Sequence, residues 1–152
     1  MTSALQPAGT RPVLSVIQGG LSVTVIRRRS DDVFGDLLWL GATDGQHRLG
    51  SARAVRTLGA GAGDDPGGGR QLDALLRLSE HYGDWLGFRG PARSTGVAKI
   101  RFLRDLPHRA DRIEYRIHIR RIGRRHETLV ADGEALCEGV PILRAEGIHV
   151  GR

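Results

Sequence analysis

The feature that most constrains the fold is a strict alternation in the last third of the chain. From Ile113 to Arg120 the odd positions are apolar and the even positions are polar. Successive side chains of a β-strand point to opposite faces, so this segment predicts a strand with one buried and one solvated face. Arg120 and Arg121 then interrupt the alternation, which predicts a β-bulge or the approach to a turn at Gly123.

Other segments predict further strands around this one. Residues 33–40 are apolar, but their period does not decide between a strand and a helical turn. Gly19 and Gly20 predict a turn between two early strands. The strands are predicted at residues 12–17, 21–29, 49–58, 126–136 and 140–150.

One helix is predicted between a glycine-rich connection at residues 59–69 and Gly87. Apolar residues recur at spacings of three and four from Arg70 to Leu86, which is the period of a helix with one buried face. Gly87 and the Gly90–Pro91 pair end it. A single helix between early strands and later antiparallel strands predicts an α+β domain with a sheet curled around the helix.

The length of 152 residues fits a single domain with one core. We expect a flexible N-terminus at residues 1–11, which lacks the basic and then apolar pattern of a secretory signal. No apolar segment is long enough to span a bilayer. Cys137 is the only cysteine, which excludes an intramolecular disulfide and fits a reducing compartment. We therefore expect a cytoplasmic protein with no membrane partner.

The net charge is +6 at pH 7, and arginine supplies almost all of the positive charge because Lys99 is the only lysine. With so much glycine and alanine, this usage is typical of a GC-rich genome. The remaining basicity fits an acidic partner. Nucleic-acid binding would favour aromatic residues among the arginines, and none lies between Ile117 and Leu129. We expect no nucleic-acid partner.

Five motifs resemble the β-hydroxyacyl-acyl-carrier-protein dehydratases of the FabA type, and the resemblance extends from about Asp64 to the C-terminus. It implies a hotdog fold at residues 12–152, in which a curved antiparallel sheet wraps a long central helix, and a dimer formed by pairing sheet edges. The motifs are Leu72–Asp73–Ala74, Tyr82–Gly83–Asp84–Trp85–Leu86–Gly87, Gly96–Phe102, Tyr115–Ile122 and Ala131–Asp132–Gly133–Glu134.

The resemblance also implies a chemistry. In this family a histidine of one hotdog domain and a carboxylate of another flank the β-hydroxyacyl thioester. The histidine removes the Cα proton and the acid helps the β-hydroxyl to leave as water, while a backbone N–H at the helix N-terminus polarises the thioester carbonyl. Asp73 is the implied carboxylate and Gly68 the oxyanion donor, with an acyl tunnel lined by Leu75, Leu76 and Phe102. No cofactor is expected, because the substrate arrives on the phosphopantetheine of acyl carrier protein.

The sequence departs from the family at the histidine. The family places it shortly before a Gly-Asp-Pro segment, and here positions 59 and 60 are Gly and Ala. A homodimer would contain two carboxylates and no base. The resemblance therefore implies a heterodimer, in which this chain supplies Asp73 to a histidine-bearing hotdog subunit in bacterial fatty-acid or polyketide synthesis of the polyene type. Two alternatives stay open: a non-catalytic hotdog that binds acyl chains or acts as a scaffold, and a hotdog acyl thioesterase.

The residues allow other interpretations of these sites. An aspartate early in a helix commonly serves as a cap or interacts with the helix dipole. The arginines at positions 120, 121, 124 and 125 predict either a solvated hairpin or a docking patch for the carrier protein and its phosphate. His118 is expected on the polar face of its strand and His126 at an exposed turn. No histidine has the spacing of a metal site, so no metal is expected.

Overall fold

The computed structural model describes residues 10–18, 21–28, 37–43, 50–58, 68–107 and 110–152, with side chains from residue 50 onward. These residues form one helix and eight strands. In chain order they are β1 (Thr10–Gln18), β2 (Leu21–Arg28), β3 (Leu37–Thr43), β4 (Ser51–Thr57), α1 (Gly69–Trp85), β5 (Arg93–Phe102), β6 (Arg112–Gly123), β7 (Thr128–Cys137) and β8 (Val140–Gly151).

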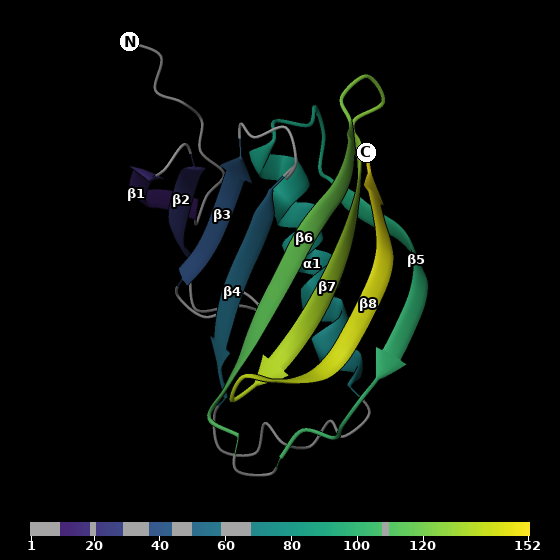
Figure 1. Ribbon diagram of the computed structural model, residues 1–152. Helices are drawn as coiled ribbons and strands as arrows, with labels where there is room; N and C mark the ends of the chain where they lie inside the picture. The colour runs from purple at the N-terminus through teal and green to yellow at the C-terminus, as the bar shows by residue number, and fades with distance from the viewer. Residues whose placement is uncertain (1–9, 19–20, 29–36, 44–49, 59–67, 108–109) are drawn as a thin grey trace.

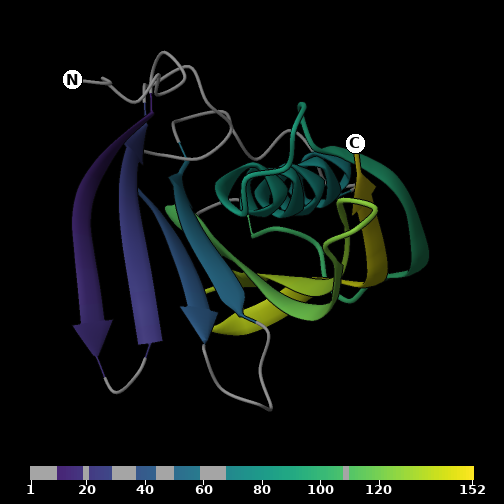
Figure 2. The same ribbon diagram turned by 90° about the horizontal axis from the view of Figure 1, so that it is seen from above.

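The eight strands belong to one antiparallel sheet in the order β1-β2-β3-β4-β6-β7-β8-β5 (Figure 1). The chain passes through α1 between β4 and β5, so β5 reaches the far edge of the sheet. The helix packs against β4 to β8, and Figure 2 shows the sheet curling beneath it. The predicted α+β class, with one helix against a curved antiparallel sheet, is confirmed.

The alternation in β6 corresponds to two faces of the sheet, as predicted. The odd positions from Ile113 to Ile119 are buried, whereas His118 and Arg120 are exposed. The register between β6 and β7 shifts between Ile119 and Arg121, so the interruption predicted at the paired arginines is confirmed. One face of this strand thus builds the core beneath α1.

Several predicted boundaries differ from the structure. β1 begins at Thr10, two residues before the predicted start of this strand at residue 12, and Thr10 and Arg11 pair with β2. β7 begins at Thr128 because Arg124–Glu127 form the preceding turn. The undecided segment at residues 33–40 contributes β3 from Leu37. Residues 1–9, the Gly19–Gly20 turn and residues 59–67, where the family histidine would fall, lie outside the described residues.

The buried side of α1 follows a helical stripe that fixes its orientation. Leu75, Leu78 and Tyr82 are fully buried on it, packed with apolar side chains of the sheet. The spacing of these residues matches the period of the helix. No helix within the described residues is long and apolar enough to cross a membrane.

Candidate functional site

The N-terminus of α1 begins at a glycine in the left-handed conformation. Gly68 has a φ of 74°, and its carbonyl accepts hydrogen bonds from the N–H groups of Gln71 (3.1 Å) and Leu72 (3.0 Å). A Cβ at position 68 would lie 2.8 Å from two ring carbons of Phe102. Among the described residues no side chain caps this end, and the first turn of the helix carries no acidic residue, so no carboxylate of that turn compensates the positive end of the helix dipole.

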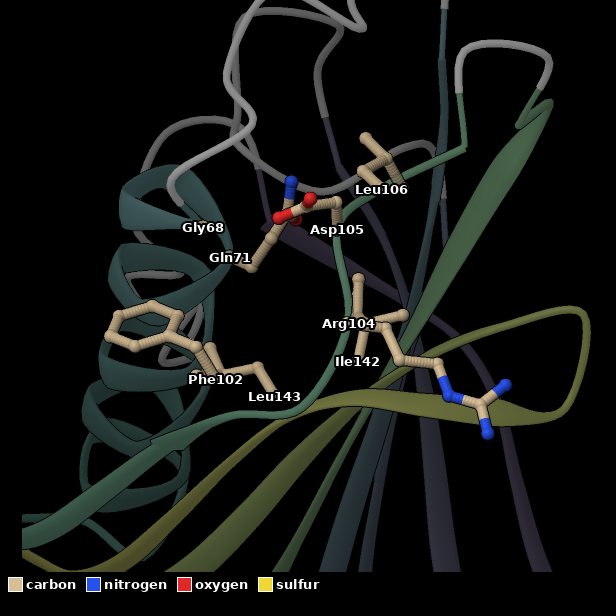
Figure 3. Close-up of a pocket in the computed structure, with 8 residues that line it drawn as sticks. All are labelled: Gly68, Gln71, Phe102, Arg104, Asp105, Leu106, Ile142 and Leu143. Carbon is tan, nitrogen blue, oxygen red and sulfur yellow. The ribbon is translucent and has the colours of Figure 1, made fainter.

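A cavity opens beside this helix end, between α1, the C-terminal end of β5 and the start of β8 (Figure 3). Apolar walls with a few polar groups are typical of sites for small molecules. Gly68 lies at the helix end of the cavity, and its apolar walls are Phe102, Leu106, Ile142 and Leu143.

Gln71 is the deeply buried polar residue of the cavity, with 3% of its surface exposed. Its Oε1 accepts a hydrogen bond of 2.5 Å from the hydroxyl of Tyr115 on β6. Burial raises the pKa of Tyr115 to about 12, an effect that the positive charge of Arg56 on β4 and its hydrogen bond to Tyr115 oppose. Because this pKa is high, the hydroxyl keeps its proton at neutral pH and remains a donor to Gln71.

Two charged residues lie at the mouth of the cavity. Arg104 and Asp105 follow β5 after Leu103, and both are exposed. Figure 3 shows the guanidinium of Arg104 directed away from the cavity and the side chain of Asp105 directed toward α1. Of these two charged side chains, only that of Asp105 is therefore directed toward α1.

Asp73, the predicted catalytic carboxylate, lies in the second turn of α1 but does not line this cavity. Its side chain is 60% exposed, and its Oδ2 lies 3.5 Å from Nε of Arg77, one turn later. Within one chain, Gly68 and Asp73 therefore do not share this cavity. The carboxylate is presented outward, where a second protein could cover it.

The three residues predicted to line an acyl tunnel have different positions. Phe102 lines the cavity with 58% of its surface exposed. Leu75 is fully buried in the core beneath α1, where its Cδ2 would lie 3.2 Å from a Cβ added to Gly133. Leu76 is partly buried against the same core. The structure thus brings Phe102 and Gly68 together and leaves both leucines outside the cavity.

The four arginines predicted as a docking patch lie on the β6–β7 hairpin and are all exposed. The hairpin is at the opposite end of the sheet from the cavity: the β5–β8 register pairs Arg93 with Gly151 at the hairpin end and Phe102 with Leu143 at the cavity end. A ten-residue strand such as β5 is roughly 30 Å long. The structure therefore does not bring these arginines to the cavity, and Arg104 is the cation nearest to it by position.

The described histidines do not supply a base at this site. His118 and His126 are exposed, as predicted, His149 is exposed on β8, and His81 is partly buried on α1. None of them lines the cavity. Within the described ranges no group of three or more histidine, cysteine or carboxylate side chains could hold a metal ion.

Sequence reasoning missed Gln71, Arg104 and Asp105. A usable signal existed for Gln71, because it precedes Leu75 by one helical turn and so falls on the apolar stripe of the helix. A polar residue on a buried stripe calls for a hydrogen-bonding partner. Arg104 and Asp105 had no such signal, because their positions depend on where the chain turns after β5.

No known family model matches this chain.

Proposed function

We propose that this chain is a hotdog domain that acts as the aspartate-bearing subunit of a β-hydroxyacyl-acyl-carrier-protein dehydratase. The observation that carries the proposal is the outward position of the Asp73 carboxylate on α1. The family-like motif around Asp73 and the sheet wrapped around a single helix support the same assignment. A carboxylate that is 60% exposed and lies outside the described cavity of its own chain is suited to a site completed by another subunit.

Because Asp73 lies outside the cavity beside Gly68, the two residues serve different cavities in this proposal. Asp73 faces the cavity of the partner subunit, which supplies the histidine. Gly68, with its predicted role as oxyanion donor, belongs to the cavity of this chain. The described lining of that cavity includes no histidine, so turnover is assigned to the partner's cavity.

The proposed reaction uses one group from each subunit. A neutral imidazole of the partner takes the Cα proton, and the electron pair of the broken C–H bond forms the Cα=Cβ double bond. The Cβ–O bond breaks, and its oxygen leaves as water after accepting the proton of the Asp73 carboxyl group. A backbone N–H at a helix N-terminus stabilises the enolate oxygen that forms in between.

The edge strand β5 supports a partner that is a different chain. Among the described strands β5 pairs only with β8, and residues 98–102 are exposed, including Ile100 and Phe102. β5 carries Arg93, Lys99 and Arg101 and no carboxylate. Two copies paired through this edge would place like charges near each other, which is unfavourable. An acidic edge strand on a partner subunit would be attracted instead.

The first half of β5 is held by α1, so the second half is the part available for pairing. The Glu80 carboxylate accepts hydrogen bonds from the backbone N–H (2.9 Å) and the hydroxyl (3.0 Å) of Ser94. Asp84 accepts a hydrogen bond of 3.0 Å from the backbone N–H of Ala92. These hydrogen bonds hold the beginning of β5 against α1.

The proposal is tested by assaying dehydration of a β-hydroxyacyl carrier protein by this chain alone and mixed with a histidine-bearing hotdog subunit. We expect enoyl thioester only from the mixture. Asp73→Asn should lower the rate at least about 100-fold, which is the usual contribution of a general acid. Glu146→Gln, an equivalent change at an exposed position of β8, should leave the rate unchanged.

Other outcomes separate the alternatives. Enoyl thioester formed by the isolated chain would show that another base exists and would overturn the shared site. Free acid formed by the isolated chain, and lost with Asp73→Asn, would indicate a thioesterase. A stable complex with no product from either preparation would indicate a scaffold or an acyl-binding protein without turnover.

A further inference from the structure

Gln71 differs from the other buried polar side chain in the described part of the molecule. Ser79 satisfies its hydroxyl within α1, where it donates a hydrogen bond of 2.9 Å to the carbonyl of Leu75. Gln71 makes its side-chain hydrogen bond through Oε1, which accepts from Tyr115. The other end of the Gln71 carboxamide takes no part in this hydrogen bond.

The hydrogen bonds of Tyr115 determine which end of the Gln71 carboxamide is left without a partner within the described residues. Arg56 hydrogen-bonds to Tyr115, and a guanidinium can only donate. The phenol oxygen therefore accepts from Arg56, and the phenol proton is donated onward to Gln71. Because the Tyr115 hydroxyl donates, the Gln71 carboxamide must face it with Oε1, which is the only acceptor of the carboxamide. The Nε2 group, with two N–H donors, is left as the other end.

This Nε2 group has no hydrogen-bond partner among the described residues, although the side chain is 3% exposed and lines the cavity. Figure 3 shows the Gln71 side chain leaving α1 toward the segment that contains Asp105 and Leu106. A buried donor without an acceptor is unfavourable. An acceptor supplied by a ligand would remove this penalty, and the surrounding walls of Phe102, Ile142 and Leu143 would contact an apolar chain.

We propose that the cavity of this chain is itself a binding site for a short acyl group, and that Nε2 of Gln71 donates a hydrogen bond to an oxygen of that group. The acceptor is either the carbonyl oxygen or a β-hydroxyl oxygen, and both present the same chemistry to the carboxamide. Tyr115 is a positioning residue, because its hydroxyl fixes the orientation of the carboxamide. The proposal depends on the proposed function only for the acyl class of the ligand.

The test measures binding to the isolated chain, without a partner and without turnover. The probes are the N-acetylcysteamine thioesters of butyrate and β-hydroxybutyrate and the butyl thioether that lacks the carbonyl oxygen. We expect the wild type to bind at least one thioester about tenfold more tightly than the thioether, which is the effect of one neutral hydrogen bond. Tighter binding of the β-hydroxy compound than of the butyryl compound would identify the hydroxyl as the acceptor, and equal binding would identify the carbonyl.

Variants separate the hydrogen bond from general packing. Gln71→Leu should abolish the preference for oxygen while keeping affinity for the thioether, and Tyr115→Phe should reduce the preference. Ser79→Ala, at the other buried polar side chain, should keep it. The proposal is overturned if the wild type shows no preference or binds no probe, or if the preference persists in Gln71→Leu. If Gln71→Leu does not fold, a preference unchanged in Tyr115→Phe overturns it.

Failure of this inference can be distinguished from failure of the proposed dehydratase. Dehydration by the mixed subunits depends on Asp73, whereas probe binding by the isolated chain depends on Gln71. Oxygen-selective binding without turnover in any mixture would support this inference and reject the dehydratase. Turnover without oxygen-selective binding would support the dehydratase and reject this inference.

Discussion

At the scale of single residues, Gly68 meets two requirements at the start of α1. Its φ of 74° favours glycine, and an added Cβ would meet the Phe102 ring at 2.8 Å. Because Phe102 is 58% exposed, its ring can move aside, and the backbone requirement should dominate. We expect Gly68→Ala to lower the free energy of unfolding by about 1–2 kcal/mol, the cost of the left-handed conformation for alanine, measured by urea denaturation.

The matched variant Gly68→Asn should cost less, since asparagine tolerates this conformation better. Adding Phe102→Ala to Gly68→Ala should recover little stability. Full recovery in the double variant would show that the ring contact, and not the backbone, imposes the glycine.

The two tyrosines predict a dependence of stability on alkaline pH. Burial raises the pKa of Tyr82 to about 12 despite the opposing charge of Arg124, and it raises the pKa of Tyr115 to about 12 as well. Their folded-state pKa values exceed the unfolded value of 10.0, so the stability they contribute is complete below pH 10.0 and is lost as the pH rises toward 12. By about pH 11 the free energy of unfolding should fall by about 1 kcal/mol for each tyrosine.

Denaturation at a series of pH values measures this loss, and Tyr115→Phe should remove about half of it. The absorbance of tyrosinate follows the ionisation directly, because the chain has only these two tyrosines. Ionisation of both near pH 10 in the folded protein would contradict the prediction.

At the scale of elements, one residue in the turn of the β7–β8 hairpin has an unfavourable backbone conformation, which a substitution should relieve. Its two turn residues, Glu138 (φ 52°) and Gly139 (φ 78°), both have positive φ, as in the type I′ turns that match the twist of paired strands. Glutamate adopts this conformation at a cost, whereas asparagine tolerates it. Glu138→Asn should therefore raise the free energy of unfolding by about 0.5–1 kcal/mol in chemical denaturation. Glu146→Asn, within β8, should give no gain, and a gain from both would point to charge.

The helix face provides a second test at this scale. Leu75 is fully buried, whereas Leu76 only packs against the margin of the core. Leu75→Ala should lower the free energy of unfolding by about 2–5 kcal/mol, and Leu76→Ala should lower it by less. Thermal denaturation of both variants measures the difference. Equal losses would mean that α1 is rotated from the orientation described here.

At the scale of the whole molecule, positive charge gathers at two separate places, the second half of β5 and the distant β6–β7 hairpin. If β5 binds the partner, reversing Lys99 and Arg101 to glutamate should weaken the complex at least about tenfold and reduce its sensitivity to salt. The same reversal at Arg121 and Arg125, which are exposed on the hairpin, should leave it unchanged. Calorimetric titration at two salt concentrations measures the affinity of each variant for the partner and its dependence on salt. A larger loss of affinity from the Arg121 and Arg125 reversal would place the interface at the hairpin.

Local sequence patterns were sufficient for much of the fold. The alternation around Tyr115 and the interruption at Arg121 predicted β6 and its irregularity there, and the helical spacing through Leu75 predicted α1. Boundaries at Thr10 and Thr128 were missed by two residues. Strand ends depend on which neighbouring strand continues the hydrogen-bond ladder, and the local sequence does not contain that information.

The candidate site, like the fold, was predictable from the sequence only in part. The sequence by itself determined a glycine at the start of the helix, a carboxylate in its second turn and an apolar stripe, because these follow from the identity and spacing of neighbouring residues. Only the tertiary structure decided that Asp73 faces outward, that Phe102 closes over Gly68, and that Tyr115 holds one end of the Gln71 carboxamide. These contacts join residues from different strands and the helix, and their proximity is set by the pairing and curvature of the sheet.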